Sequence, residues 1–398
     1  MTTLLARVGR LFTAGQPIAE KVDVLIGAGS IMAVGVSGSL DPPDECELYD
    51  CQGALLTAGL IDAHTHPVYG RPRLAEISER SAGTSYQVIA ARGGGIKATV
   101  QDTREVPWEK LELGLRDRLR RWLQAGTTTV EAKTGYWLER DGELQAVRLL
   151  RKLSTDTQLP SLAVTFLGAH GLPQEFEGRR QEFVEEVGRW SPDAHREGAR
   201  FADVFCDEGA FTVAESRQLL SSARQAGMAL RIHADELALT GGTELAIELG
   251  AVSADHLLRI GAAQIAALAA SSTVATLCPV TALAMGRTPP ARELLAAGVP
   301  VALGSDHNPG TSGATSMSLI VWLAVSELGL SVEQALTAAT LGGSLSLALP
   351  DRGRIAPGMA ADLVLWDTDH EGGFAWSPEL RPRQVWRAGE PCRGQSAS

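Results

Sequence analysis

The sequence contains no run of about 20 apolar residues, and this absence excludes a membrane-spanning helix. It also has no basic excess: the net charge of −11 excludes nucleic acid and an anionic membrane as partners, since both bind basic patches. The first residues do not show the basic and then apolar order of a signal peptide. There are few cysteines and no Cys-x-x-Cys pair, which favours free thiols in a reducing cytoplasm; the five are Cys46, Cys51, Cys206, Cys278 and Cys392.

The two ends of the chain differ from its middle. With 398 residues, 44% of them apolar, the chain has the size of one large domain plus a small one. Short β-like runs broken by Gly and Pro occur at both ends, at Leu4–Val8, Asp23–Ile26, Ile31–Val34, Asp362–Trp366 and Gln384–Ala388. We therefore predict a small β-sandwich domain from residues 1–56 and 352–398, with residues 57–351 inserted as a second domain.

The middle region alternates short β-branched runs with helix-like stretches, which is typical of βα units and a parallel sheet. One stretch places Leu111, Leu115, Leu119 and Trp122 on a single helix face. Eight runs predict an α/β fold, a (β/α)8 TIM-like barrel. A doubly wound open sheet is the alternative, but no Gly-x-Gly-x-x-Gly follows a first strand. The runs are Leu60–His66, Thr127–Lys133, Leu162–His170, Ala202–Cys206, Ala229–His233, Ala251–His256, Thr273–Pro279 and Pro300–Asp306.

Six of the eight histidines fall at predicted strand ends, where barrels of this kind carry their reactive groups. His64 and His66 are two residues apart on a strand and therefore project to the same side. His233 and Asp306 end the fifth and eighth strands. Three imidazoles and a carboxylate form a ligand set for one divalent or trivalent metal ion, zinc or iron, with a position left for water.

Two further strand-end residues suit the chemistry of such an ion. A metal lowers the pKa of bound water toward ~7, which supplies a hydroxide to attack a carbonyl. Glu236 is placed to move the water's proton to a leaving nitrogen, and His256 to hydrogen-bond the developing oxyanion. The alternative for Glu236 is a helix N-terminal acid stabilised by the dipole. We expect Asp255 and Lys133 to be structural or to support the metal ligands.

The barrel inserted in a split β domain, together with these ligands, resembles the mononuclear branch of the amidohydrolase superfamily. Longer segments are similar to the imidazolonepropionase family, which opens a ring in histidine degradation. They are Asp-Ala-His-Thr-His (62–66), Ala-Arg-Gly-Gly-Gly-Ile (91–96), Lys-Thr-Gly-Tyr (133–136), Leu-Gly-Ala-His (167–170), Asp-Val-Phe-Cys-Asp-Glu-Gly-Ala-Phe (203–211), His-Ala-Asp-Glu (233–236), Gly-Ala-Val-Ser-Ala-Asp-His (250–256) and Asp-His-Asn-Pro-Gly-Thr-Ser (306–312).

The resemblance implies a substrate, 4-imidazolone-5-propanoate, whose ring amide C–N bond is hydrolysed to N-formimino-L-glutamate. It implies Arg73 as the partner of the substrate carboxylate, with Arg80 as a second candidate. It also implies a homodimer. The other substrate contacts that it implies are Tyr136, His170, Glu236, Asn308, Gly310 and Thr311.

The sequence departs from the family at three places beside the site. The loop after His66 is atypical around Arg71 and Pro72. His307 stands where an apolar aromatic residue is usual, and it either alters metal preference or points into the barrel wall. Trp137 replaces a small residue. Two other functions stay open: a related hydrolase, such as formimino-glutamate deiminase or an aromatic deaminase, and a metal-free scaffold. Scaffold proteins of this kind lose ligands, whereas this chain keeps the full set.

Overall fold

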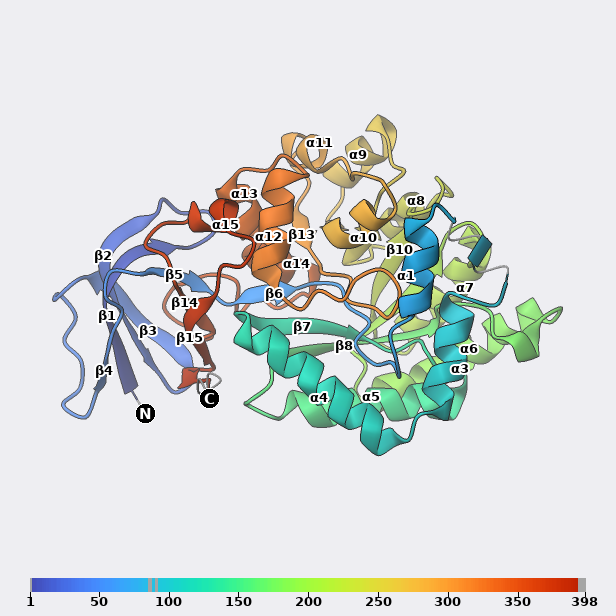
Figure 1. The fold of residues 1–398 in the computed structure, drawn as a ribbon, viewed down its shortest axis with the longest axis horizontal. Coiled ribbons are helices and arrows are strands. Elements are labelled where there is room, and N and C mark those ends of the chain that lie inside the picture. Colours follow the sequence, from blue (N-terminus) through green and yellow to red (C-terminus); the bar gives the residue numbers. More distant parts are fainter. Residues whose placement is uncertain (1, 85–87, 90–91, 393–398) are drawn as a thin grey trace.

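The strands form two sheets, one from the middle of the chain and one from its two ends (Figure 1). The structure, a computed structural model, describes residues 2–84, 88–89 and 92–392. Ala91, the first residue of one family-like segment, lies outside the described residues. Within those ranges, no helix combines the length and the apolar character that crossing a membrane requires.

The middle sheet is parallel, and its eight strands neighbour one another in chain order, as predicted for a (β/α)8 barrel. Each predicted run overlaps one strand. The strands are β6 (Leu60–Asp62), β7 (Thr127–Lys133), β8 (Ser161–Ala169), β9 (Phe201–Cys206), β10 (Ala229–Ala234), β11 (Ser253–His256), β12 (Val274–Leu277) and β13 (Val301–Leu303).

The barrel closes between its first and last strands through single hydrogen bonds. Beyond Asp62 and Leu303, the Ala63 N–H donates to the Leu303 carbonyl at 3.2 Å, and the Asp306 N–H donates to the His64 carbonyl at 3.0 Å. β6 and β13 are therefore shorter than predicted, because their last residues pair only at isolated positions. The closure brings the residues that follow both strands to one place.

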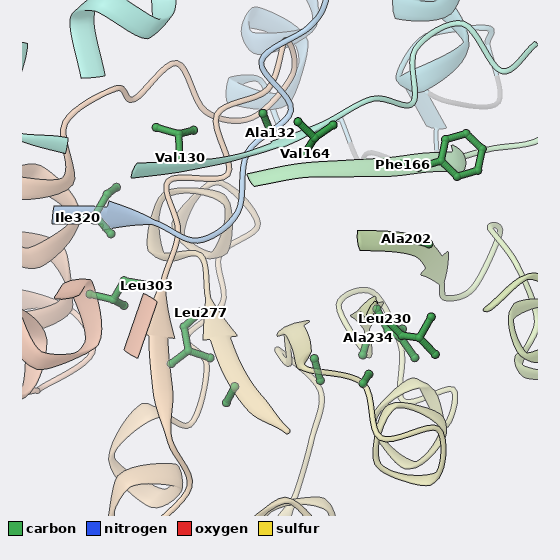
Figure 2. Packing of buried hydrophobic residues seen from close by; sticks show 14 of the residues in the cluster. Val130, Ala132, Val164, Phe166, Ala202, Leu230, Ala234, Leu277, Leu303 and Ile320 are labelled. Atoms are coloured by element: carbon green, nitrogen blue, oxygen red, sulfur yellow. The ribbon is translucent and has the colours of Figure 1, made fainter. Parts of the chain in front are cut away.

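Helices cover the outside of the barrel (Figure 1). The predicted stripe lies on α4 (Trp108–Gln124), and all four of its side chains are buried. Side chains of successive strands, among them Val130, Val164 and Leu277, join Ile320 of α12 in one apolar cluster (Figure 2). The other helices are α1 (Leu74–Ser81), α3 (Ile96–Glu105), α5 (Arg140–Ser154), α6 (Arg180–Glu197), α7 (Val213–Gln225), α8 (Gly242–Glu248), α9 (Ala262–Ala269), α10 (Pro279–Ala284), α11 (Ala291–Ala296), α12 (Met317–Ser326), α13 (Val332–Thr337), α14 (Gly343–Ser346) and α15 (Gly373–Trp376), with short turns η1 (Gln174–Phe176) and η2 (Ala338–Gly342).

The second sheet joins both ends of the chain in one mixed, connected sheet. Its order is β16-β15-β14-β5-β1-β2-β3, and β4 pairs with β1. The first part supplies β1 (Thr2–Phe12), β2 (Ala19–Gly27), β3 (Ser30–Val36), β4 (Glu47–Asp50) and β5 (Leu55–Ala58), and the last part β14 (Leu363–Trp366), β15 (Pro382–Arg387) and β16 (Glu390–Pro391). The two parts meet where β5 pairs antiparallel with β14.

The chain passes from this sheet into the barrel at Gly59, between β5 and β6. A side chain at Gly59 would place its Cβ 2.0 Å from Thr128 Oγ1, so only glycine fits here. β5 crosses the predicted junction at residues 56–57 and was not predicted separately. The reason is that Leu55–Asp62 is apolar almost throughout, and two buried strands in sequence look like one run.

Candidate active site

All four predicted metal ligands meet at one point at the carboxyl ends of the barrel strands. His66 Nε2 lies 3.3 Å from His64 Nε2 and 3.2 Å from His233 Nε2. Asp306 Oδ1 lies 3.7 Å from His64 Nε2 and 3.5 Å from His66 Nε2. All four side chains are buried. The structure therefore brings together the four residues that the sequence placed at strand ends.

The donor atoms fit a metal ion because a carboxylate lies beside Nδ1 of two of the rings and favours the tautomer whose lone pair is on Nε2. His64 Nδ1 lies 2.7 Å from Asp255 Oδ2, and His233 Nδ1 lies 3.0 Å from Asp203 Oδ2. With the proton on Nδ1, each ring presents a lone pair at Nε2. Burial lowers the pKa of His64 and His66 well below the usual range, so these rings are neutral. Lone pairs that face one another at this distance repel unless a cation lies between them.

Asp306 is held by a residue that the sequence did not predict. The Thr281 hydroxyl donates to Asp306 Oδ2, and it also lies 3.0 Å from the Thr311 hydroxyl. Burial raises the pKa of Asp306 to about 6, against the lowering effect of the Thr281 hydrogen bond. Thr281 follows β12, the one predicted strand without a charged residue or a histidine at its end, so the sequence pattern did not point to it.

Glu236 and His256 lie beside the ligands, with Glu236 Oε1 3.7 Å from His256 Nδ1. Neither ring nitrogen of His256 has a hydrogen-bond partner among the described residues, so both are available to a substrate. Burial raises the pKa of Glu236 well above its usual range, and Asp306 and Asp207 add to the shift. Asp207 fixes the segment by accepting the Glu236 N–H at 2.7 Å.

Glu236 is not the helix-terminal acid that the sequence left as an alternative. It lies in the segment between β10 and α8, six residues before Gly242, where α8 begins. The carboxylate at this helix start is Asp235, which accepts hydrogen bonds from the N–H groups of Thr240 and Thr243. Glu236 is therefore left facing the pocket.

One pocket contains nearly all the predicted site residues. Those lining it are His66, Arg73, Tyr136, His170, His233, Glu236, His256, Asp306, Asn308 and Thr311. Buried His64 and Gly310 do not belong to this lining. The lining residues that the sequence did not predict are Ile96, Phe205, Leu237, Thr281 and Met285. Most of these are apolar. In the sequence, an apolar residue near a strand end looks the same whether it lines a pocket or belongs to the core.

Arg73 reaches the pocket with its guanidinium already fixed. Its Nε donates to Glu76 Oε2 at 2.9 Å, and its Nη1 donates to the Thr99 hydroxyl. Arg80 does not line the pocket; its Nη2 donates to the carbonyl of Gly310. The geometry thus separates the two arginine candidates, with Arg73 facing the pocket and Arg80 supporting the loop beside it.

His170 and Tyr136 form an aromatic wall against the metal ligands. The His170 ring stacks on His66, with centroids 4.8 Å apart and planes at 14°. Its Nδ1 lies 3.1 Å from the Gly135 carbonyl. Burial and the neighbouring His233 lower the pKa of His170 to about 3, so the ring is neutral and its Nε2 is an acceptor. The Tyr136 ring lies 5.0 Å from it.

Asn308 uses its side chain mainly to shape its own loop. Its Oδ1 accepts the N–H groups of Gly310 and Thr311, both at 2.8 Å, and its Nδ2 donates to the Asp306 carbonyl at 2.6 Å. These bonds place Thr311 at the pocket.

His307 and Trp137, two of the departures from the family pattern, lie away from the predicted metal ligands. His307 Nε2 lies 3.0 Å from the Tyr69 hydroxyl and its Nδ1 lies 3.1 Å from the Ala314 carbonyl, which places the ring in the barrel wall. Trp137 stacks on Trp108 with centroids 4.6 Å apart. Neither residue lines the pocket.

Lys133 lies beneath the histidines rather than in the pocket. Its Nζ is 2.7 Å from both Glu131 Oε1 and Asp203 Oδ2. Burial alone would lower the pKa of Lys133, but the carboxylates of Asp203 and Glu131 raise it above its usual value. The side chain is therefore an ammonium with a supporting role, as the sequence led us to expect.

Comparisons with known proteins agree with the barrel fold and with the family that the sequence resembles. A family model described as the amidohydrolase family matches residues 55–392. An imidazolonepropionase of Bacillus velezensis is 39% identical, over 92% of this chain and 90% of that protein. One from Porphyromonas gingivalis is 41% identical, over 90% and 85%. A solved 5-methylcytosine deaminase of Klebsiella pneumoniae shares the fold, with a TM-score of 0.78 and 18% identity, covering 100% of this chain and 98% of that one.

Proposed function

This chain belongs to the imidazolonepropionases of the amidohydrolase family, hydrolases of histidine degradation, and from that premise we propose how its pocket opens 4-imidazolone-5-propanoate. Water adds to the ring carbonyl carbon, the amide C–N bond breaks, and the product is N-formimino-L-glutamate. The observation that carries the proposal is one pocket lined both by a fixed guanidinium, Arg73, and by the histidine and carboxylate cluster.

We propose that His64, His66, His233 and Asp306 hold one zinc or iron ion. Three imidazoles and a carboxylate suit either metal. When bound, such an ion lowers the pKa of a coordinated water and polarises a carbonyl. Asp255 and Asp203 keep the His64 and His233 rings in the tautomer that presents Nε2.

The substrate carboxylate binds Arg73 in this proposal. Its Nε and Nη1 are engaged by Glu76 and Thr99, so the plane of the guanidinium is fixed before the substrate arrives. A fixed planar cation recognises a carboxylate with little loss of side-chain entropy. Tyr136, His170 and the Asn308–Thr311 loop enclose the ring.

In this proposal Glu236 transfers the proton of the attacking water, and His256 binds the carbonyl oxygen of the substrate. A carboxyl group whose pKa is raised is a better match for proton transfer near neutral pH than an ordinary one. Glu236 takes a proton from the attacking water and gives one to the leaving ring nitrogen. His256, with both ring nitrogens unpartnered among the described residues, donates to the carbonyl oxygen as negative charge develops there.

Product analysis tests this function. The purified, metal-loaded protein is given urocanate and urocanase, because the substrate is too unstable to store, and formimino-glutamate and ammonia are measured. We expect formimino-glutamate without ammonia, well above the spontaneous rate. An E236Q variant that binds metal controls for uncatalysed ring opening. Ammonia release instead would favour a deiminase or deaminase of the same superfamily.

We further propose residues 57–351 as one domain and residues 1–56 with 352–398 as the other, a homodimer as the assembled form, and the cytoplasm as its location. Elemental analysis of the purified protein distinguishes zinc from iron, and light scattering coupled to size exclusion measures the assembly.

A further inference from the structure

A buried lysine lies where three carboxylates around the metal ligands meet. The carboxylates belong to Glu131, Asp203 and Asp255, and the Lys133 Nζ lies 2.7, 2.7 and 3.7 Å from them. None of these four side chains has exposed surface. Charges sealed from water at such distances persist only when they are paired, so each of these contacts is a strong constraint on position.

Each carboxylate leads to a different metal ligand or to the backbone between two ligands. Asp203 Oδ2 is 3.0 Å from His233 Nδ1, and Asp255 Oδ2 is 2.7 Å from His64 Nδ1. Glu131 Oε2 accepts the N–H of Thr65 at 3.1 Å, and Thr65 is the residue between His64 and His66. The Lys133 N–H also donates to the Thr65 carbonyl at 3.1 Å. The ammonium therefore connects to His233 and to His64 through one carboxylate each, and through Glu131 to the Thr65 backbone between His64 and His66.

The balance of charge among these buried side chains requires the Lys133 ammonium. Three carboxylates face two cations, Lys133 and Arg231, whose Nη2 lies 3.1 Å from Asp255 Oδ2. Arg231 holds Asp255 and comes within 3.6 Å of Glu131, while Lys133 is the ion-pair partner of Asp203. Without Lys133, Asp203 Oδ2 would lose its ion-pair partner and keep only the His233 ring, while Oδ1 would still accept the backbone N–H groups of Val204 and His233.

We propose that Lys133 is the positioning residue of the metal centre: its ammonium fixes Asp203, Asp255 and Glu131, and through them orients His233, His64 and the Thr65 backbone. This inference rests on the proposed metal site. A carbamate at this lysine would be repelled by the same three carboxylates, so Lys133 acts as a cation and not as a ligand. Losing a group that orients ligands typically weakens metal binding by about 10–100-fold.

Cobalt binding to a K133M variant tests the proposal. Co²⁺ reports coordination geometry through its visible spectrum, independently of turnover. We expect K133M to bind Co²⁺ about 10–100-fold more weakly than the unchanged protein, with an altered spectrum. The matched control is K152M, which removes the same charge from a side chain that is 62% exposed and pairs with Glu112; it should match the unchanged protein.

The outcomes separate this inference from the function on which it rests. If the unchanged protein binds no Co²⁺, the proposed metal site itself is wrong. If it binds Co²⁺ and K133M matches it in affinity and spectrum, the metal site stands and the role of Lys133 is overturned. Should K133M fail to fold, D203N decides: the amide still accepts the His233 N–H but loses the attraction to Lys133, and unchanged Co²⁺ affinity and spectrum would overturn the proposal.

Discussion

At the scale of single residues, Gly310 shows how tightly Arg73, the proposed partner of the substrate carboxylate, is packed. A Cβ at this position would lie 1.9 Å from Arg73 Nη2, and Glu76 and Thr99 limit how far the guanidinium can retreat. We expect G310A to raise KM about tenfold or more with a smaller change in kcat, because hydrogen bonds to charged groups contribute roughly 1.5–3 kcal/mol.

Steady-state kinetics with the coupled urocanase assay measures this effect. G313A is the matched control, since a Cβ there meets nothing within 4 Å and lies in the same loop. Equal KM values for the two variants would show that Arg73 does not bind the carboxylate from this position.

His307, although next to a metal ligand, is expected to have no effect on metal content. Its ring nitrogens face Tyr69 and Ala314, away from the cluster. We expect H307F to keep the metal per chain while lowering the free energy of unfolding by about 1–3 kcal/mol, because the Tyr69 hydroxyl and the Ala314 carbonyl lose a partner. Elemental analysis and urea denaturation measure the two quantities, with Y69F as a second probe of the same contact. A fall in bound metal would place His307 in the metal site.

At the scale of the elements, the packing of α4 depends on the one face whose side chains are buried. Leu115 is fully buried, whereas Leu113 on the same helix is 64% exposed. We expect L115A to lower the free energy of unfolding by about 2–5 kcal/mol through the lost burial and the cavity. L113A should stay within about 0.5 kcal/mol. Urea denaturation of both variants checks this, and similar losses would mean that the helix is not packed as described.

Elements were predictable from the sequence where a simple period or spacing exists. The eight strands and the α4 stripe follow from apolar runs, and the clustering of His64, His66, His233 and Asp306 follows from polar residues at strand ends. The pocket's apolar lining was not predictable, because Phe205 and Leu237 look like core residues. Asp203 was also missed, since a carboxylate within a buried strand is recognised only when its distant partners, Lys133 and His233, are known.

At the scale of the whole molecule, the proposed metal centre joins the segment after β6, the strand β10 and the segment after β13, which lie far apart in the chain. A ligand that binds only the folded state stabilises it, by ~4 kcal/mol at 1,000 times its Kd. We therefore expect chelation to lower the melting temperature by roughly 5 °C. Calorimetry with and without a chelator, followed by return of zinc or iron, measures this. A melting temperature unaffected by metal removal would mean that the cluster holds no ion that matters to the fold.

The pairing of β5 with β14 affects the order in which parts of the molecule are completed during synthesis. A ribosome makes Leu56 of β5 early and its partner Leu365 of β14 roughly 300 residues later. At ~5–20 residues per second this is a delay of about 15–60 s. During synthesis of the barrel, the edge of β5 that later pairs with β14 has no strand beside it, while β1 can pair with the other edge. The sheet made from both ends is therefore the last part of the molecule to be completed, and the nascent chain carries an exposed strand edge, a site for aggregation or for a chaperone, until then.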